Sequence, residues 1–318
     1  MILPEREHGG NLDAAIRQFG GAPTDWLDLS TGINPVPYPL PPLAPELWTR
    51  LPDRSAFAAV EAAARAFWSV PDGAEVVIAP GASALIAAMP DLAGEGAVEV
   101  LSPTYNEHAA AFAGRGRPVR EVVQAGDDPV ALRVVVHPNN PDGRVYGAEV
   151  LEGAAITVVD ESFADVATTS FVDRTATPGC VVLKSFGKFW GLAGLRLGFA
   201  ICMPEHAAIL RARLGPWAAS GPALAVAAQA LNDPGWAEQA RARLAVDARR
   251  LDAIMGSERL VGGCDLFRLY AFDDAAAVQQ QLARRHIWTR TFGYDPRWLR
   301  LGLPAGDRDF DRLAEAMA

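Results

Sequence analysis

The sequence contains six short apolar segments, and each is followed by small or polar residues. Strand-length segments that are apolar throughout are typical of parallel β-strands buried on both faces. In an open α/β sheet, ligands bind outside the carboxyl ends of the strands, where the unusual residues of this chain lie. The pattern therefore predicts an α/β fold with a mostly parallel sheet and one binding site assembled from several loops. The segments with their loops are residues 74–89, 97–112, 132–143, 154–163, 179–188 and 195–204.

The composition argues against several functions. The chain has 318 residues and is 50% hydrophobic, which suits one large domain or two modest ones. Its formal net charge of -9 argues against binding to nucleic acid or to an anionic membrane surface, so an anionic ligand must be held by a few local basic groups. The three cysteines are widely spaced and form no metal or disulfide framework. We therefore expect a protein of a reducing compartment, the cytoplasm, without a bound metal.

Two stretches bear on membrane targeting. The first residues, MILPEREHGGN, lack the apolar core of a signal peptide. The most apolar long stretch, residues 214–231, is interrupted by prolines and small residues. We therefore expect no membrane-spanning helix.

One group of residues after the predicted strands suits a phosphate. Gly81, Ala82 and Ser83 open a predicted helix, where free backbone N–H groups and the helix dipole favour an anion. Ser185 and Arg196 can add a hydroxyl and a bidentate guanidinium to the same phosphate. These five residues are the predicted phosphate-binding set.

A second group suits the remaining parts of one cofactor. Asp160, at a buried strand end, is costly unless it meets a cation or a hydrogen-bond donor. Asn140 can donate to a phenolate oxygen, and Lys188 can form an imine with an aldehyde. A phosphate, a ring nitrogen that needs a carboxylate, a phenolic oxygen and an aldehyde together describe pyridoxal 5′-phosphate (PLP).

Five motifs spread over nearly the whole chain carry a resemblance: HGGNLDAAIRQFG, LDLSTGINP, HPNNPDG, DESF and SFGKFWGLAGLRLGF. With these motifs the chain resembles the fold type I PLP enzymes of the class I and II aminotransferase family. Within that family it is most similar to the L-threonine-O-3-phosphate decarboxylases of cobalamin biosynthesis. Histidinol-phosphate aminotransferases are the next nearest resemblance.

The resemblance implies an aspartate aminotransferase-like architecture. An N-terminal arm, residues 1–44, is expected to contribute to the small domain and the active site. Residues 45–219 are expected to form the large PLP-binding domain, and residues 220–318 a connecting helix and a smaller α+β domain. The resemblance also implies a homodimer. In relatives a tyrosine of the partner subunit reaches the cofactor phosphate, but this chain has Leu51 at that position, so this contact must be missing or replaced.

The resemblance also assigns roles to the cofactor residues. Lys188 matches the lysine that binds PLP covalently and later donates a proton. Asp160 matches the aspartate at the ring nitrogen, and Asn140 the asparagine at the ring oxygen O3′. The plainer alternatives are a surface lysine, a helix N-cap and a turn residue, respectively.

Two positions differ from many relatives. His108 falls where an aromatic residue usually stacks on the cofactor ring, and imidazole can stack or form a hydrogen bond; the alternative is a purely structural histidine. Phe163 replaces a tyrosine that touches O3′ in many aminotransferases, so that hydrogen bond cannot form. Phenylalanine here is typical of the threonine-phosphate decarboxylases and favours decarboxylation.

The expected substrate-binding residues come from both ends of the chain. Arg300 matches the arginine that binds the substrate acid, and Arg290 is expected to help hold the substrate phosphate. His8, in the HGGN motif, is expected to reach that phosphate unless the segment is only a flexible tail. Gly32 and Asn34, in STGINP, are expected to contact the substrate.

These expectations describe PLP-dependent decarboxylation of L-threonine O-3-phosphate to (R)-1-amino-2-propanol O-2-phosphate. The alternative is an aminotransferase of the histidinol-phosphate type, because the orientation of the substrate decides which bond breaks and the sequence does not show it. Some decarboxylases carry a second arginine near the position of Pro304, so phosphate recognition in this chain can differ from theirs. A catalytically idle PLP-binding protein is a third reading, which the intact Lys188 and Asp160 oppose.

Overall fold

The computed structural model describes residues 8–126 and 128–318, and the chain divides into two compact units. The large unit comprises Pro37–Asn140 and Arg144–Gln239. The small unit comprises the described part of Met1–Val36 together with Pro141–Gly143 and Ala240–Ala318.

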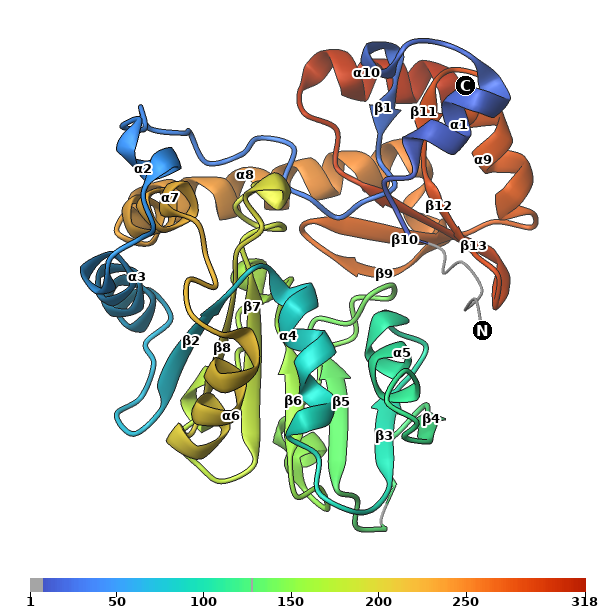
Figure 1. Cartoon of the computed structure of the whole chain (residues 1–318). Coiled ribbons are helices and arrows are strands. Elements are labelled where there is room, and N and C mark those ends of the chain that lie inside the picture. Colours follow the sequence, from blue (N-terminus) through green and yellow to red (C-terminus); the bar gives the residue numbers. More distant parts are fainter. Residues whose placement is uncertain (1–7, 127) are drawn as a thin grey trace. The chain divides into compact units, whose positions relative to one another are not determined.

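The large unit is built on a seven-stranded sheet with the order β2-β8-β7-β6-β5-β3-β4 (Figure 1). Only β8 runs antiparallel to its neighbours, β2 and β7. All six predicted segments form strands of this sheet, which confirms the mostly parallel α/β fold. The strands are β2 (Glu75–Ala79), β3 (Val98–Leu101), β4 (Val119–Val122), β5 (Leu132–Val136), β6 (Thr157–Asp160), β7 (Cys180–Ser185) and β8 (Gly198–Cys202).

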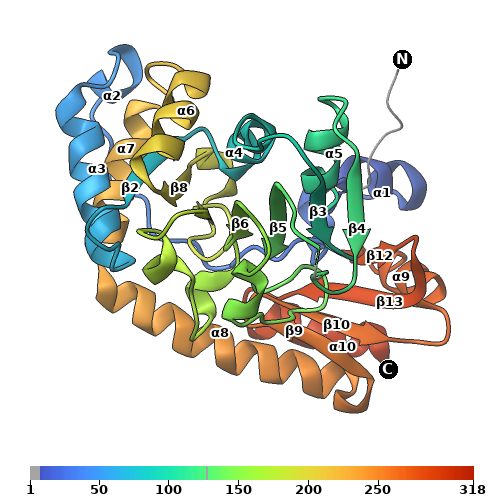
Figure 2. The same cartoon turned by 90° about the horizontal axis from the view of Figure 1, so that it is seen from below.

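Helices bury this sheet because its central strands are apolar on both faces. Every residue of β5 and β6 is buried. Helices α4, α5 and α6 lie along one face of the sheet (Figures 1 and 2), while α3 packs against β2 and α7. The helices are α2 (Glu46–Thr49), α3 (Arg54–Phe67), α4 (Ala82–Ala88), α5 (Glu107–Ala113), α6 (Pro204–Leu214) and α7 (Gly221–Leu231).

The large unit begins and ends at different residues from the domain predicted over 45–219. It begins at Pro37 because the buried Tyr38 belongs to its core. The Tyr38 ring packs edge-on against Trp236, with ring centroids 5.1 Å apart, and its hydroxyl donates to Asp233 at 3.3 Å. The unit ends at Gln239, inside helix α8 (Pro234–Met255), so one helix continues from the large unit into the small one.

The small unit is α+β. Its antiparallel sheet has the order β12-β13-β10-β9, and a two-stranded parallel sheet joins the N-terminal segment to it by pairing Leu27 with Ile287. The elements are α1 (Leu12–Phe19), β1 (Leu27–Asp28), β9 (Leu260–Cys264), β10 (Phe267–Ala271), α9 (Ala275–Ala283), β11 (Ile287–Trp288), β12 (Arg290–Phe292), β13 (Asp295–Gly302) and α10 (Asp307–Met317). Among the helices of the described chain, none combines the length and apolar character needed to cross a membrane.

Candidate active site

The predicted cofactor residues of the large unit come from the ends of neighbouring strands. Asp160 is the last residue of β6, and Ser185 is the last residue of the adjacent β7. The two strands are parallel, with Asp160 opposite Leu183, so both residues lie at the same edge of the sheet. Lys188 follows Ser185 in the loop that leaves this edge.

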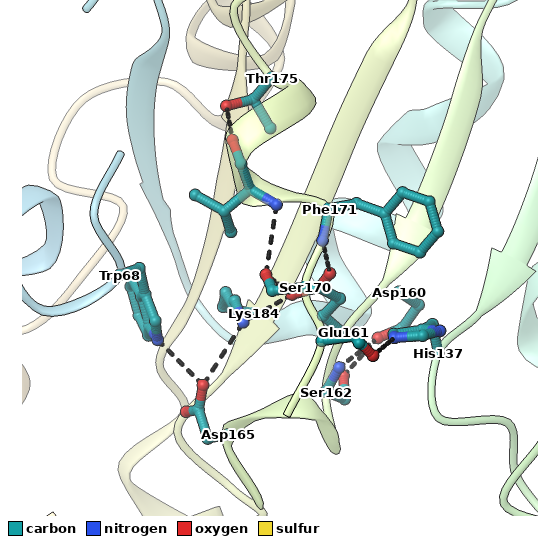
Figure 3. A network of polar contacts seen from close by, with 12 residues as sticks. Trp68, His137, Asp160, Glu161, Ser162, Asp165, Ser170, Phe171, Thr175 and Lys184 are labelled. Carbon is teal, nitrogen blue, oxygen red and sulfur yellow. Dashed lines mark hydrogen bonds and ion pairs between the residues drawn. The ribbon is translucent and has the colours of Figure 1, made fainter. Parts of the chain in front are cut away.

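Asp160 is a buried carboxylate with hydrogen-bond partners on both oxygens, and Figure 3 shows its side chain beside Ser162. Oδ1 accepts from the Ser162 backbone N–H at 2.9 Å and from its hydroxyl at 2.5 Å, and Oδ2 lies 2.9 Å from Nε2 of His108. Burial by itself raises the pKa of Asp160, but the His108 and Ser162 contacts outweigh burial and hold the pKa below its usual range. The side chain is therefore a carboxylate at neutral pH, as a partner for a protonated ring nitrogen must be.

The structure gives His108 the second of its two expected contacts. The imidazole is buried and bonds Asp160, so it supports the carboxylate. The aromatic ring beside it is Tyr105, which is half-buried, with its centroid 6.1 Å from that of His108. The sequence reasoning missed Tyr105, although an aromatic residue three positions before the histidine was a usable signal. Tyr105 is thus an additional candidate for contact with the cofactor ring.

Lys188 is half-buried in a loop whose neighbours are anchored in the core. Phe186, Phe189 and Trp190 are fully buried, and the rings of Phe186 and Trp190 stack with centroids 4.9 Å apart. The Lys188 Nζ lies 5.2 Å from the centroid of the buried Phe163 ring. The lysine therefore projects from a loop with a buried aromatic support, and its ammonium lies beside the Phe163 ring.

The predicted phosphate-binding residues also converge. Gly81 has a φ of +88°, and a Cβ built on it would lie only 2.6 Å from Nη2 of Arg196. Glycine is thus required for the Arg196 guanidinium to approach the backbone that leads into Ala82 and Ser83. A Cβ on Gly198, the first residue of β8, would lie 2.4 Å from the Ala82 nitrogen, so this position too leaves no room for a side chain. The hydroxyl of Ser185, at the end of β7, accepts from the Gly187 N–H at 3.2 Å.

The two asparagines of HPNNPDG have different environments. Asn139 is buried: its amide donates to the Pro103 carbonyl at 3.0 Å, and its oxygen accepts from Thr104 at 2.7 Å. It therefore ties the loop after β5 to the loop after β3. Asn140 is half-buried, and it remains the candidate for the ring oxygen.

In the small unit, Ser30 connects the predicted substrate-binding segments. Its carbonyl accepts from Nη2 of the buried Arg300 at 2.7 Å, and its hydroxyl accepts from the Gly10 N–H at 2.7 Å and donates to Asp28 at 2.6 Å. Gly9 lies so close that a Cβ on it would be 2.4 Å from the Ser30 carbonyl oxygen. The HGGN segment and Arg300, far apart in sequence, thus meet at one serine that the sequence reasoning did not single out.

The other predicted substrate residues lie in the same unit. His8 is exposed and directly precedes Gly9, while Gly32 is buried two residues after Ser30. Asn34 is buried, and its side-chain oxygen accepts from Arg243 at 2.6 Å and from the Val36 N–H at 3.0 Å. These bonds give Asn34 a role in shaping its loop. Arg290 is half-buried and lies directly opposite Arg300 in the β12–β13 pair.

Comparison with known proteins places this arrangement in a family. The family model described as aminotransferase class I and II matches residues 42–317. The chain belongs to this family. Family membership confirms the prediction of a PLP-dependent enzyme of fold type I. The described residues contain no cluster of three or more metal-binding side chains.

Two relatives are similar to this chain over almost the whole of its sequence. The threonine-phosphate decarboxylase of a Sinorhizobium species is 40% identical, and that of Pseudomonas aeruginosa is 41% identical; each alignment covers 98% of this chain and 97% of the relative. The solved histidinol-phosphate aminotransferase of Sinorhizobium meliloti, in complex with pyridoxal-5′-phosphate, has a TM-score of 0.78 at 20% identity and covers 99% of this chain and 94% of its own.

The residues of the large unit fit PLP. The turn at Gly81 with Arg196 offers a guanidinium and backbone N–H groups to a phosphate, the ionised Asp160 suits a protonated pyridine nitrogen, and Lys188 supplies an amine for the aldehyde. The fit rests on three different functional groups that the sheet edge and its loops bring together.

The lowered pKa of Asp160 predicts how the stability of the cofactor-free protein depends on pH. Because the pKa is depressed in the folded state, the stability that the carboxylate contributes is fully present above its unfolded pKa, about 3.9, and is lost as pH falls through the folded value. We expect the difference in unfolding free energy between the wild type and Asp160→Asn to be constant from pH 7 to about 5 and to shrink below about 4. Urea unfolding across this range measures it; a difference that grows on acidification would contradict the assignment.

Proposed function

We propose that the chain catalyses PLP-dependent decarboxylation of L-threonine O-3-phosphate to (R)-1-amino-2-propanol O-2-phosphate, a reaction of cobalamin biosynthesis. The observation that carries the proposal is the similarity to two threonine-phosphate decarboxylases, at 40% and 41% identity over 98% of the chain. The solved histidinol-phosphate aminotransferase is far less similar, at 20% identity. The net reaction releases carbon dioxide and adds one proton at Cα.

The residues of the large unit would hold the cofactor and manage the proton. Gly81 to Ser83, Ser185 and Arg196 would bind its phosphate, Asp160 its ring nitrogen and Asn140 its O3′. When bound, PLP supplies an electron sink for the electron pair that the departing carboxylate leaves behind. The Lys188 amine, supported beside Phe163, would deliver the proton to Cα.

The small unit supports binding of a dianionic group. Arg290 and Arg300 lie directly opposite each other on adjacent strands, where like charges repel. Burial, followed by the charge of Arg290, lowers the pKa of Arg300 to about 10. A phosphate would offset this repulsion, since guanidinium groups bind phosphate by two parallel hydrogen bonds. Gripping the substrate by its phosphate would leave its carboxylate free to be oriented for cleavage, which favours decarboxylation over transamination.

The decisive experiment uses purified protein reconstituted with PLP and supplied with L-threonine O-3-phosphate but no keto acid. We expect release of carbon dioxide, and no release from Lys188→Ala, which lacks the amine. Isotopic carbon dioxide capture measures it, and circular dichroism checks that the variant is folded. Absence of release, with amino transfer from histidinol phosphate to 2-oxoglutarate instead, would establish the aminotransferase alternative.

The arginine pair gives a second prediction. We expect Arg290→Lys and Arg300→Lys each to lower kcat/KM for L-threonine O-3-phosphate by about tenfold to a hundredfold, the value of a charged hydrogen bond, because lysine cannot bind phosphate in the bidentate manner. Arg297→Lys is the matched control, since Arg297 lies on the same strand, is exposed and bonds Asp295 at 3.0 Å. Equal kinetics for all three variants would exclude the pair from substrate binding.

We also propose that the enzyme is a homodimer. Several large apolar side chains of the large unit are more than half exposed, and three of them lie in neighbouring segments: Trp48 at 68%, Leu51 at 64% and Trp217 at 54%. They belong to touching segments, because a Cβ on Gly221, just beyond Trp217, would lie 2.5 Å from the carbonyl oxygen of Leu47. Aromatic side chains exposed in this way are enriched where protein surfaces associate. The predicted cytoplasmic location stays a prediction.

Sedimentation velocity tests the dimer. We expect the wild type to sediment as a dimer and the double variant Trp48→Asp/Trp217→Asp to shift towards monomer, because burying two carboxylates in an apolar interface is unfavourable. Val246→Asp is the control, since Val246 is also an apolar residue, 55% exposed, but lies on α8 in the small unit. A monomeric wild type would refute the proposal, and a dimeric double variant would place the interface elsewhere.

A further inference from the structure

We propose that Lys184 is a positioning residue for the cofactor site and that it acts through a buried ion cluster with Glu161 and Asp165. We call these three residues the Lys184 cluster. The inference rests on the proposed cofactor site around Asp160 and Lys188, and it extends that site to residues that touch neither the cofactor nor the substrate.

The cluster is compact and buried (Figure 3). The Lys184 Nζ lies 2.6 Å from Oε2 of Glu161 and 3.4 Å from Oδ1 of Asp165. Oδ1 of Asp165 also accepts from the indole N–H of Trp68 at 2.9 Å, and the Trp68 ring centroid lies 5.7 Å from the Lys184 Nζ. One ammonium is therefore shared by two carboxylates.

The cluster holds the same two strand ends that carry the cofactor residues. Lys184 directly precedes Ser185 on β7, and Glu161 directly follows Asp160 at the end of β6. Successive side chains of a strand point to opposite faces. The Glu161 N–H also bonds the Leu183 carbonyl at 2.9 Å. The Lys184–Glu161 pair thus joins β6 and β7 at the residues next to Asp160 and Ser185.

The cluster also closes the loop after β6. Glu161 accepts from the Ser170 hydroxyl at 2.7 Å and from the Phe171 N–H, which brings the two ends of the loop together. Asp165, in the middle of the loop, bonds Lys184. The second and third residues of this loop are Ser162, which donates to Asp160, and Phe163, whose ring contacts the Lys188 ammonium. Lys184 therefore fixes a loop that touches both the ring-nitrogen partner and the reactive lysine.

Charge explains why Lys184 is the central member. Burial alone lowers the pKa of Lys184, but Glu161 and then Asp165 outweigh burial and raise the pKa above its usual value. The ammonium is thus charged throughout the physiological pH range. Removing it would leave two carboxylates buried without their cation, and such a loss disturbs the local structure more than removal of a surface pair.

The chain contains a matched pair without access to the site. Arg133 is fully buried, with its Nε 2.6 Å from Glu99, and it donates to the Val150 carbonyl at 2.9 Å. Both residues are second in their strands, β5 and β3, at the amino ends of the parallel strands and opposite the cofactor edge. A purely structural role for Lys184 predicts that loss of either pair has the same consequences.

The experiment compares Lys184→Met with Arg133→Met. For each, urea unfolding gives the stability of the cofactor-free protein, absorbance titration gives the PLP dissociation constant, and a pH titration of the visible absorbance gives the midpoint of the bound cofactor. We expect both variants to lose stability. Only Lys184→Met should bind PLP about tenfold more weakly, by analogy with the loss of an outer-shell partner of a metal ligand. It should also shift the absorbance midpoint by about half a unit or more. Lys184→Arg should restore both properties in part.

Two additional variants keep the test decisive. Trp68→Phe removes only the indole donor to Asp165, so it should shift the absorbance midpoint in the same direction as Lys184→Met but by less. If Lys184→Met does not fold, a Trp68→Phe variant with the wild-type midpoint overturns the proposal. Equal PLP affinity and midpoint in Lys184→Met and Arg133→Met would also overturn it. Lys188→Ala tests the cofactor site separately, because a wild-type visible band that survives this change would place PLP elsewhere.

Discussion

The buried carboxylate of Asp160 is the group on which the rest of the site depends. A buried charge at the end of an apolar strand is stable only if hydrogen-bond donors surround it. His108 and Ser162 contact separate oxygens of the Asp160 carboxylate. This requirement explains why a histidine occupies the first turn of α5 and why a serine follows two residues after the aspartate. The carboxylate stays ionised as a consequence, and an ionised group at this edge is what a protonated ring nitrogen requires.

Glu161, the next residue, is also a buried carboxylate that needs hydrogen-bond donors or a cation. Two consecutive buried carboxylates at one strand end would repel each other if they shared a solvent-free space, and the alternation of the strand sends them to different faces. Asp160 is balanced by neutral donors and His108, whereas Glu161 is balanced by a full cation, Lys184. The DESF motif is therefore a structural unit as well as a chemical one: its first residue serves the site, its second fixes the loop, and its last, Phe163, lies beside Lys188.

Much of the fold could be predicted from the sequence because strand ends are marked by composition. All six apolar segments form strands, and Asp160, Ser185 and Lys188 follow the edge that the pattern indicated. Strand β4 was missed because it is a half-exposed edge strand with alternating charge, VREV. The partner of His108 could not be predicted from its position alone. Whether its imidazole stacks on the cofactor ring or forms a hydrogen bond depends on the direction of the side chain, which the sequence does not show. Lys184 gave no signal either, because a lysine within an apolar strand has meaning only when its carboxylates are known.

The segments predicted to bind the substrate acid show the same limit of sequence-based prediction more strongly. Ser30 accepts hydrogen bonds from Arg300, 270 positions away in the sequence, and from Gly10, 20 positions away. No local periodicity of the sequence predicts such long-range contacts. The motifs at both ends named the segments that meet here, but not the serine that joins them. This junction also bears on specificity, because the Ser30 carbonyl accepts from one nitrogen of the Arg300 guanidinium. Because Arg290 lies directly opposite, the pair presents two positive charges at a defined spacing. A doubly charged phosphate would match that pair better than a single carboxylate, which is a physical reason for the proposal of a phosphorylated substrate.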